Sequence, residues 1–252
     1  MKLTFLGTGT STGVPEIGCK CEVCTSTDPR DARLRSSALL EEGDTTILID
    51  CGPDFRTQML RADVNKIDAV LLTHKHYDHI VGIDDLRPYT RSKELPIYAD
   101  RETEMQIHTM FPYCFYKVKY PGVANIAVHS ISQSTFEIGD VEITPLRVFH
   151  GMMGITAYRF GKLAYITDMS YIEPSELDKL CGVEVLVMNA LRFAKPHSTH
   201  QTVLEAFRII EKIQPKRVYF THLMHHIGLH AKFEKCLPEG VYLAYDGLEI
   251  EI

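Results

Sequence analysis

Short apolar runs separated by polar turns recur along the whole chain and predict β-strands. The runs span Lys2–Gly7, Thr45–Asp50, Asp68–Thr73, Pro96–Asp100, Val141–Phe149, Lys162–Asp168, Val183–Leu191 and Lys216–His222. Several are continuously apolar and β-branched, which is typical of strands covered on both faces. The segment "QTVLEAFRIIEKIQ" (Gln201–Gln214) has helical spacing instead. Strands interspersed with such segments predict an α/β protein in which helices sandwich sheets.

The helical segment carries its own start and stop signals. Its apolar positions share one face at Val203, Leu204, Phe207, Ile210 and Ile213. We expect Ser198 and Gln201 to form a capping box at its start and Pro215 to end it. The sequence shows no repeat, low-complexity tract or linker, so we expect a single domain over residues 1–252.

Composition narrows the function classes. The 252 residues are 45% hydrophobic, enough for a sizeable core, and the formal net charge of −6 disfavours a general nucleic-acid binder. No stretch reaches the roughly 20 apolar residues of a membrane span, and the start has no signal-peptide pattern, so we expect no membrane association and a cytoplasmic location. An odd count of seven cysteines suits metal binding in a reducing compartment better than a disulfide framework.

A histidine-rich stretch, "THKHYDH", follows the apolar run "AVLL". His74 and His76 alternate at the end of a predicted strand, so they point the same way and can converge on one ion. Asp78 and His79 can reach a second ion nearby. Packing gives no reason for adjacent imidazoles at the end of a buried strand, because each would need another source of solvation. The stretch therefore predicts a centre for zinc, manganese or iron.

Other candidate ligands end other predicted strands. His150, Asp168 and His222 each follow an apolar run and precede a turn. Any one of the histidines alone is more often a solvated or satisfied core residue than a ligand. With the first cluster accepted, further ligands are needed, and strand ends are where binding residues commonly lie.

A second cluster, "CKCEVC", spaces Cys19, Cys21 and Cys24 to wrap one tetrahedral zinc ion. A fourth ligand must come from elsewhere, with His225 the leading candidate and His226 and Cys236 as competitors. Such a closed site would be structural. It would tie the N-terminal loop to the loop that carries His222.

The segment "KPHSTHQT" adds candidate proton donors, because histidine titrates near neutral pH. Either His197 or His200 could protonate a leaving alkoxide, and we favour His200, with His197 as a substrate-binding residue. Arg33 and Arg35 could reach a phosphate, but a solvated or ion-paired surface role is the simpler interpretation.

The "THKHYDH" motif resembles the H-x-H-x-D-H signature of the metallo-β-lactamase fold superfamily. The later His150, Asp168 and His222 follow that family's order, and the opening "LTFLGTGTSTGVP" and "ILIDCG" are similar too. The resemblance implies a four-layer αβ/βα sandwich with the metal site along one edge. It implies one ion held by His74, His76 and His150, a second held by Asp78, His79 and His222, and Asp168 bridging the two.

The cysteine cluster is similar to that of PhnP-type phosphodiesterases, which implies His225 as the fourth structural zinc ligand and His200 as the acid. Asp78 and His200 are thus the expected catalytic residues. Two divalent ions, zinc or manganese with iron as an alternative, would share a water and generate hydroxide near neutral pH for attack on phosphorus. We expect a hydrolase of small anionic phosphodiesters, including cyclic ribosyl phosphates or 2′,3′-cyclic nucleotides.

Alternatives remain at this stage. A tRNA 3′-processing nuclease shares the ligands and a similar "HST" segment, but its arm for tRNA is not found in this sequence and the net charge disfavours it. Ester or lactone hydrolysis is a further option on the same scaffold. A non-catalytic metal-binding module is the least favoured alternative, because a structural site has no need of two open ions. Related proteins often form dimers, so a homodimer is compatible with the resemblance.

Overall fold

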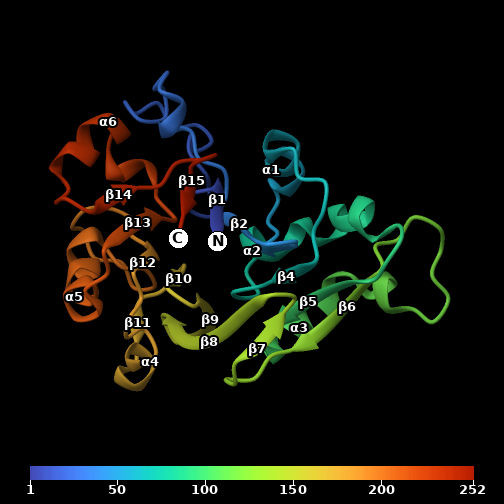
Figure 1. Ribbon diagram of the computed structural model, residues 1–252. Helices are drawn as coiled ribbons and strands as arrows, with labels where there is room; N and C mark the ends of the chain where they lie inside the picture. The colour runs from blue at the N-terminus through green and yellow to red at the C-terminus, as the bar shows by residue number, and fades with distance from the viewer.

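The computed structural model describes residues 1–252 and contains two β-sheets (Figure 1). The first sheet has the strand order β15 (Glu249–Glu251), β1 (Lys2–Gly7), β2 (Ser37–Glu42), β3 (Thr45–Ile49), β4 (Ala69–Leu71), β5 (Leu95–Ala99) and β6 (Ile126–Ser130). The second has the order β11 (Tyr171–Ile172), β8 (Val141–His150), β9 (Met153–Phe160), β10 (Leu163–Ile166), β12 (Val185–Asn189), β13 (Arg217–Thr221) and β14 (Val241–Leu243), with β7 (Phe136–Ile138) paired to β8.

Helices connect the strands and cover the outer faces of the sheets. The α-helices are α1 (Phe55–Ala62), α2 (Tyr77–Ile80), α3 (Arg101–Met110), α4 (Pro174–Asp178), α5 (Val203–Ile213) and α6 (His230–Phe233). Short 3₁₀ helices are η1 (Pro29–Asp31), η2 (Val81–Thr90), η3 (Pro112–Phe115), η4 (His225–Ile227) and η5 (Glu234–Cys236). In Figure 1, α4 and α5 lie at the left of the molecule, and α1 and α3 lie to the right of them.

Successive side chains of each strand point to opposite faces of the sheet, and this alternation produces three apolar layers. In β3, Ile47 and Ile49 pack into the cluster shared by both sheets, whereas Leu48 packs outward with Phe55 of α1. Other strands of both sheets divide their side chains in the same way, and the outer face of the second sheet packs against α5. The result is the order helix, sheet, sheet, helix. The expected four-layer αβ/βα architecture is confirmed.

Parallel pairing within each sheet brings strand ends to a common edge. Strands β3 to β6 run parallel to one another, as do β10, β12, β13 and β14. Ligands bind outside the carboxyl ends of such strands. The two sheets meet there through hydrogen bonds from the Tyr158 hydroxyl to the Leu72 carbonyl (2.6 Å) and from Thr156 N to Thr73 O (2.9 Å). We call this edge, between the end of β4 and the start of β9, the seam.

Several elements differ from those expected. Seven strands were not anticipated: β2, β6, β7, β9, β11, β14 and β15. Their runs are short or interrupted by polar residues, such as "SALLEE" in β2, and pairing with other strands stabilises them. The expected capping box of Ser198 with Gln201 is wrong. Thr202 caps α5 instead, and its side chain and the Glu205 side chain bond reciprocally to each other's backbone N–H. Leu204, expected on the buried face, is 49% exposed because α5 turns Ala206 and Ile209 inward.

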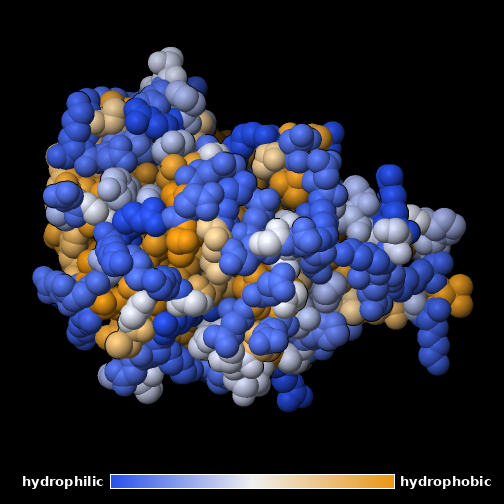
Figure 2. Space-filling model, viewed as in Figure 1, coloured by the Kyte–Doolittle hydropathy of each residue, from blue (hydrophilic) through white to orange (hydrophobic).

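The surface on the side shown in Figure 2 is mostly hydrophilic, with hydrophobic patches between the hydrophilic residues. None of the helices combines the length and the apolar character that a membrane crossing requires.

Replacing Thr202 by Ala removes the capping box of α5. Loss of such a cap costs about 1 kcal/mol, so we expect the melting temperature to fall by about 2–4 °C for a chain of this size. Thermal unfolding monitored by circular dichroism measures the change. Thr57→Ala, at an exposed position of α1 with no side-chain hydrogen bond, is the control. Equal melting temperatures for the two variants would contradict the assigned cap.

Candidate metal centres at the seam

The side chains predicted from strand ends converge at the seam. His74 lies just beyond β4, His150 ends β8, Asp168 follows β10 and His222 follows β13. The backbone at Asp168 (φ 58°) and His222 (φ 53°) is left-handed, a conformation that costs non-glycine residues about 1–3 kcal/mol and often marks functional sites. These sharp turns let the side chains leave the strand ends toward one point. We call the group of His74, His76, Asp78, His79, His150, Asp168 and His222 the histidine–aspartate cluster.

A glycine makes room for the loop that carries the histidine-rich motif. A Cβ atom at Gly52 would lie 2.0 Å from the Asp78 carbonyl oxygen, so only glycine fits there. Cys51 N donates to the His79 carbonyl (2.7 Å), and Gly82 N donates to the Cys51 carbonyl (2.8 Å). The segment after β3 thus fixes the position of the Asp78–His79 pair.

One half of the cluster has the geometry of a four-ligand cation site. One donor atom each of Asp78, His79, Asp168 and His222 lies within 4.8 Å of every other. His222 Nε2 is 2.9 Å from Asp168 Oδ1, and His79 Nε2 is 3.3 Å from both Asp78 Oδ2 and Asp168 Oδ2. The Nε2 atoms of His79 and His222 are buried, and despite these short distances neither makes a hydrogen bond of good geometry. The residues expected to share one ion are therefore brought together.

The other half gathers the remaining histidines around Asp168. His74 Nε2 and His76 Nδ1 are 3.0 Å apart, and the ring centroid of His150 lies 5.0 Å from that of His76. His74 Nε2 also lies 3.6 Å from Asp168 Oδ2. Donor atoms of His150, Asp168 and His200 lie within 4.8 Å of one another. Asp168 faces both halves, which is the position expected of a bridging carboxylate.

Neighbouring acceptors fix the tautomers of three histidines. His79 Nδ1–H donates to Asp50 Oδ2 (2.7 Å), and His150 Nδ1–H donates to the carbonyl oxygen of Asp168 (2.8 Å). The Thr73 hydroxyl donates to Asp50, so it accepts from His74 Nδ1–H at 3.0 Å. In the neutral form of each ring, Nε2 is then the nitrogen without a proton and can bind a cation, the usual arrangement around metal-ligating histidines.

Buried negative charge at the cluster requires cationic compensation. Asp50, Asp78 and Asp168 are buried, and none of them forms an ion pair with lysine or arginine. Burial acts to lower the pKa of His79, but the carboxylates of Asp50, Asp168 and Asp78 outweigh it and raise that pKa well above its ordinary value. Burial also acts to lower the pKa of His222, but the carboxylate of Asp168 outweighs it and raises that pKa to about 9. Divalent cations would supply this charge, and the donor set of imidazoles and carboxylates fits them.

His200 lies against the cluster and His197 lies outside it. The His200 ring stacks on that of His222 at 4.9 Å, and its Nε2 atom is 3.7 Å from Asp168 Oδ2. Burial lowers the pKa of His200 to about 4. His197 is exposed, and its Nδ1 atom lies 3.1 Å from Thr199 Oγ1 and 3.3 Å from His200 Nδ1. Of the two candidate acids, His200 is thus the one that reaches the cluster directly.

The cysteine cluster closes around His225. The Sγ atoms of Cys19, Cys21 and Cys24 each lie 3.3 Å from His225 Nδ1. The backbone N–H of Cys24 is the main cause that lowers the pKa of Cys21 to about 6, so its thiolate is readily formed. Glu16 Oε2 lies 3.2 Å from His225 Nε2 and orients the ring. Three sulfurs and one nitrogen at this spacing fit a tetrahedral zinc ion.

Three contributing residues were missed or misjudged in the sequence. Asp50 follows β3 as Asp168 follows β10, so the same strand-end rule would have found it. Glu16 lies in an irregular loop and carries no sequence signal. Arg33 was expected at the surface, and this is wrong. It is 3% exposed and donates to Thr8 Oγ1 (2.9 Å) and to His230 Nδ1 (3.2 Å), since the long-range packing of the N-terminal loop covers it.

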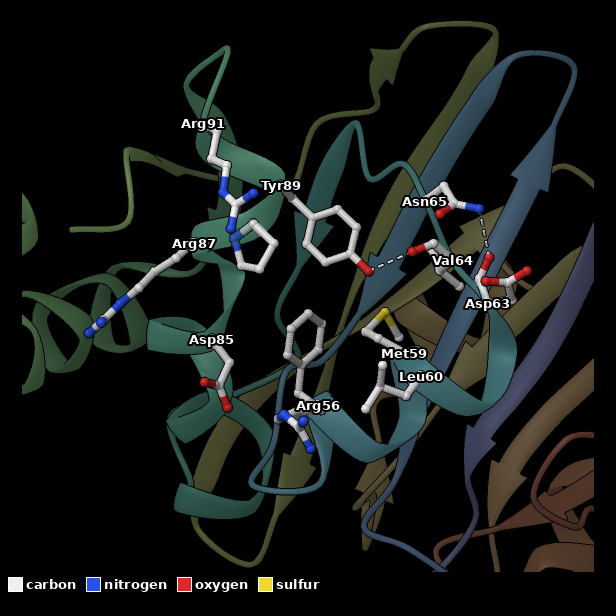
Figure 3. Close-up of a pocket in the computed structure, with 12 residues that line it drawn as sticks. Arg56, Met59, Leu60, Asp63, Val64, Asn65, Asp85, Arg87, Tyr89 and Arg91 are labelled. Carbon is white, nitrogen blue, oxygen red and sulfur yellow. Dashed lines mark hydrogen bonds between the residues drawn. The ribbon is translucent and has the colours of Figure 1, made fainter. Parts of the chain in front are cut away.

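A separate cavity of about 530 Å³ lies between α1 and η2 (Figure 3). Its floor includes Met59 and Tyr89, and the Tyr89 hydroxyl donates to the Val64 carbonyl (2.7 Å). Arg56 and Arg91 stand at its rim. No residue of the histidine–aspartate cluster lines it, so the large cavity and the candidate metal centre are distinct features.

Comparison with known proteins identifies relatives over the whole chain. Residues 45–223 match the family model described as the beta-lactamase superfamily domain. A crystal structure of a diphosphatase from the PhnP family is 41% identical, has a TM-score of 0.92, and covers 99% of this chain and 96% of that one. An octanoyltransferase of Porphyromonas gingivalis is 41% identical over 251 residues, which are 99% of this chain but 51% of that protein.

A more distant relative is a ribonuclease Z of Methanococcus maripaludis, 32% identical over 143 residues, which are 54% of this chain and 40% of that enzyme. The chain thus spans about half or less of the length of these two curated relatives. Their names describe proteins larger than the matched segment.

Asp50→Asn should weaken metal binding at the cluster. The amide keeps the size and tolerates the left-handed backbone at this position (φ 61°), but it removes the charge that orients His79. Loss of such a partner typically costs about 10- to 100-fold in metal affinity. Competition with a chromophoric chelator measures the affinity. Asp44→Asn, in an exposed turn, is the control, and equal affinities for both variants would count against the role of Asp50.

Cys24→Ser should remove the metal of the cysteine cluster and lower the melting temperature. Structural zinc sites contribute folding free energy directly, so the bound-metal content should fall by about one ion per chain. Elemental analysis and thermal unfolding provide the two measurements. Cys236→Ser replaces an exposed free cysteine outside the cluster and should change neither. An unaltered metal content in Cys24→Ser would refute the assignment.

Proposed function

Because this chain belongs to the metallo-β-lactamase superfamily, in its PhnP-like branch, we propose that it is a metal-dependent phosphodiesterase acting on small phosphodiesters. Its family is one of metal-binding hydrolases, and the diphosphatase structure is similar over almost its full length. Cyclic ribosyl phosphates and 2′,3′-cyclic nucleotides are the substrates we propose.

One observation carries the proposal. The acids Asp78 and Asp168 are buried amid imidazoles whose Nε2 atoms lack hydrogen-bond partners or are the nitrogen without a proton in the neutral ring. A buried polar network without a bound ion would satisfy these groups with hydrogen bonds from the protein. Here they face a common point beside His200, which is what a hydrolytic centre for an anionic substrate requires.

Two ion positions would be held by separate groups of residues. One comprises Asp78, His79 and His222, and the other His74, His76 and His150, with Asp168 shared between them. When bound, a pair of divalent ions supplies a nucleophile near neutral pH and neutralises charge as it develops on phosphorus. We propose zinc or manganese, with iron as an alternative, and one structural zinc ion at the cysteine cluster.

His200 would deliver the proton that the leaving alkoxide needs. Its Nε2 atom is buried and has no hydrogen-bond partner, so a proton held there is available to a group that enters the site. The pKa of about 4, caused by burial, keeps His200 neutral at pH 7 without substrate. An anionic phosphoryl group beside the ring would raise that pKa and favour the protonated form that donation to the alkoxide requires. His197 lies next to it and would help to position the substrate.

The free cysteines bear on the cellular compartment. All seven cysteines are unpaired in the structure, which suits a reducing compartment, and we propose the cytoplasm.

A nuclease of the ribonuclease Z type is the second candidate. The M. maripaludis relative supports it over about half of this chain. The net charge of −6 speaks against a large nucleic-acid substrate, since duplex and tRNA binding is dominated by phosphate contacts with basic surfaces. Cleavage of precursor tRNA by the purified protein would favour the nuclease over the small-substrate phosphodiesterase.

His200→Ala should lower turnover of 2′,3′-cyclic AMP by about 10²- to 10⁴-fold, the usual contribution of general acid catalysis. Hydrolysis of bis(p-nitrophenyl) phosphate should fall far less, because p-nitrophenolate leaves without a proton. Steady-state kinetics on both substrates measure the difference, with metal content checked by elemental analysis.

His129→Ala replaces an exposed histidine outside the site and serves as the control. An equal loss on both substrates with full metal content would remove His200 from the role of acid. Absence of hydrolysis of either substrate by the metal-loaded wild-type protein would overturn the proposed function itself.

A further inference from the structure

A pocket beside α5 is not explained by the candidate metal centre. It encloses about 260 Å³ between α5 and the segment that holds β11 and α4, which lie near one another in Figure 1. We call it the outer pocket. No residue of the histidine–aspartate cluster lines it, and neither does His200. Its lining includes Ser170, Ile172, Leu177, Gln201, Arg208 and Lys212.

One wall of the outer pocket carries a buried hydrogen-bond acceptor without a donor. Gln201 is only 7% exposed, and its Nε2 atom donates to the Ser170 carbonyl oxygen (3.3 Å). Its Oε1 atom is buried and accepts from no group of the protein. Buried polar atoms in folded proteins nearly always have a partner. The Gln201 carbonyl oxygen therefore calls for an N–H or O–H donor, and the pocket that Gln201 lines is where a ligand would supply one.

Two cations without partners line the same pocket. Arg208 and Lys212 are exposed and lie one turn apart on α5, and neither forms an ion pair or a side-chain hydrogen bond. The one acid in the lining, Glu205, is engaged in the helix cap, where its Oε2 atom accepts from Thr202 N (2.8 Å) and Thr202 Oγ1 (2.7 Å). In a chain of net charge −6, this unpaired positive charge favours an anionic group such as a carboxylate.

The walls between the acceptor and the cations are apolar. Ile172 and Ile209 are buried, and Leu177 is half-buried. Arg208 lies five residues beyond Val203, where α5 begins, which is about 7.5 Å along the helix axis. A ligand that reaches both ends therefore carries its donor and its carboxylate on opposite sides of an apolar body about one ring wide. The volume of about 260 Å³ restricts that ligand to a small molecule.

The same wall supports one histidine of the metal centre. The Ser170 hydroxyl donates to the Phe149 carbonyl oxygen (2.8 Å) and accepts from Gly151 N (2.9 Å). These two residues stand on either side of His150 in the sequence. The position of Ser170 thus fixes the backbone from which the His150 side chain projects.

Gln201 supports two more groups of the centre. Its backbone N–H donates to the Met169 carbonyl oxygen (3.1 Å), which joins the segment that carries His200 to the segment that carries Asp168. The His200 Nε2 and Asp168 Oδ2 atoms lie 3.7 Å apart across this junction. A ligand that orders Gln201 in the outer pocket would therefore also order the support of the metal centre.

We propose that the outer pocket is an effector site for a small carboxylate that carries an O–H or N–H donor. The donor would bond to Gln201 Oε1, and Arg208 and Lys212 would bind the carboxylate by charge-assisted hydrogen bonds. A support that is already ordered lowers the entropy cost of metal binding, so the ligand would raise the metal affinity. Because coupling between two sites is reciprocal, the metal would raise the ligand affinity by the same factor. The inference does not depend on the reaction that the centre catalyses.

The first test measures binding of two aromatic acids to the metal-loaded protein by isothermal titration calorimetry. We expect saturable binding of 4-hydroxybenzoate and about 10-fold weaker binding of benzoate, which lacks the donor. Arg208→Ala should weaken the binding of 4-hydroxybenzoate by about 10- to 100-fold, the size of one charge-assisted hydrogen bond. Arg101→Ala, an equal charge change at an exposed position of α3 outside the pocket, should leave it unchanged.

The second test measures metal affinity by competition with a chromophoric chelator, with and without saturating 4-hydroxybenzoate. The acid should raise the metal affinity of the wild type about 5-fold or more, and at the same concentration it should raise that of Arg208→Ala far less.

Several results would overturn the proposal. Equal binding of 4-hydroxybenzoate by the wild type and Arg208→Ala would show that the acid binds elsewhere, on the metal ions included. Equal affinities for the two acids would remove the bond to Gln201 and with it the ligand class. Binding that leaves the metal affinity unchanged would refute the effector role. Neither test uses hydrolysis, so a failure of the proposed phosphodiesterase function is recognised separately.

Discussion

Negative charge buried at the seam is the constraint on which the rest of the structure depends. Asp50, Asp78 and Asp168 are withdrawn from water, yet no lysine or arginine forms an ion pair with them. Only imidazoles, and cations held by them, are available to balance the charge. The sharp turn at His222, the missing side chain at Gly52 and the hydrogen bonds between the sheets all serve to bring these groups within reach of one another.

Much of the fold followed from local pattern. Strands buried on both faces, such as β3 and β12, are continuous apolar runs, and the helical periodicity of α5 is strong enough to be recognised without tertiary contacts. Strands such as β2 and β9 were not recognised because their sequences mix polar and apolar residues, and long-range pairing decides their conformation. The start of α5 was misplaced by a few residues because Ser198 and Thr202 offer competing caps, and packing selects between them.

The candidate site was predictable where its signals are local. The histidine-rich motif lies within one short segment, and His150 and Asp168 lie at or just beyond the ends of apolar strands, so both could be named without a structure. Residues whose partners are distant in the sequence were harder to predict. Glu16 contacts His225 across more than two hundred residues of chain, and nothing in its own surroundings marks it. Burial of Arg33 depends on contacts with Ala244 and His230 that no pattern near Arg33 reveals.

The cluster draws its donors from both sheets: His74 and His79 come from the first, and His150, Asp168 and His222 from the second. An ion coordinated there would act as a cross-link between the two halves of the molecule. By mass action, the resistance of the whole fold to unfolding then becomes a function of the free metal concentration. Low free metal would therefore destabilise the fold as well as remove the catalytic ions, so the metal supply and the lifetime of the protein would depend on one set of side chains.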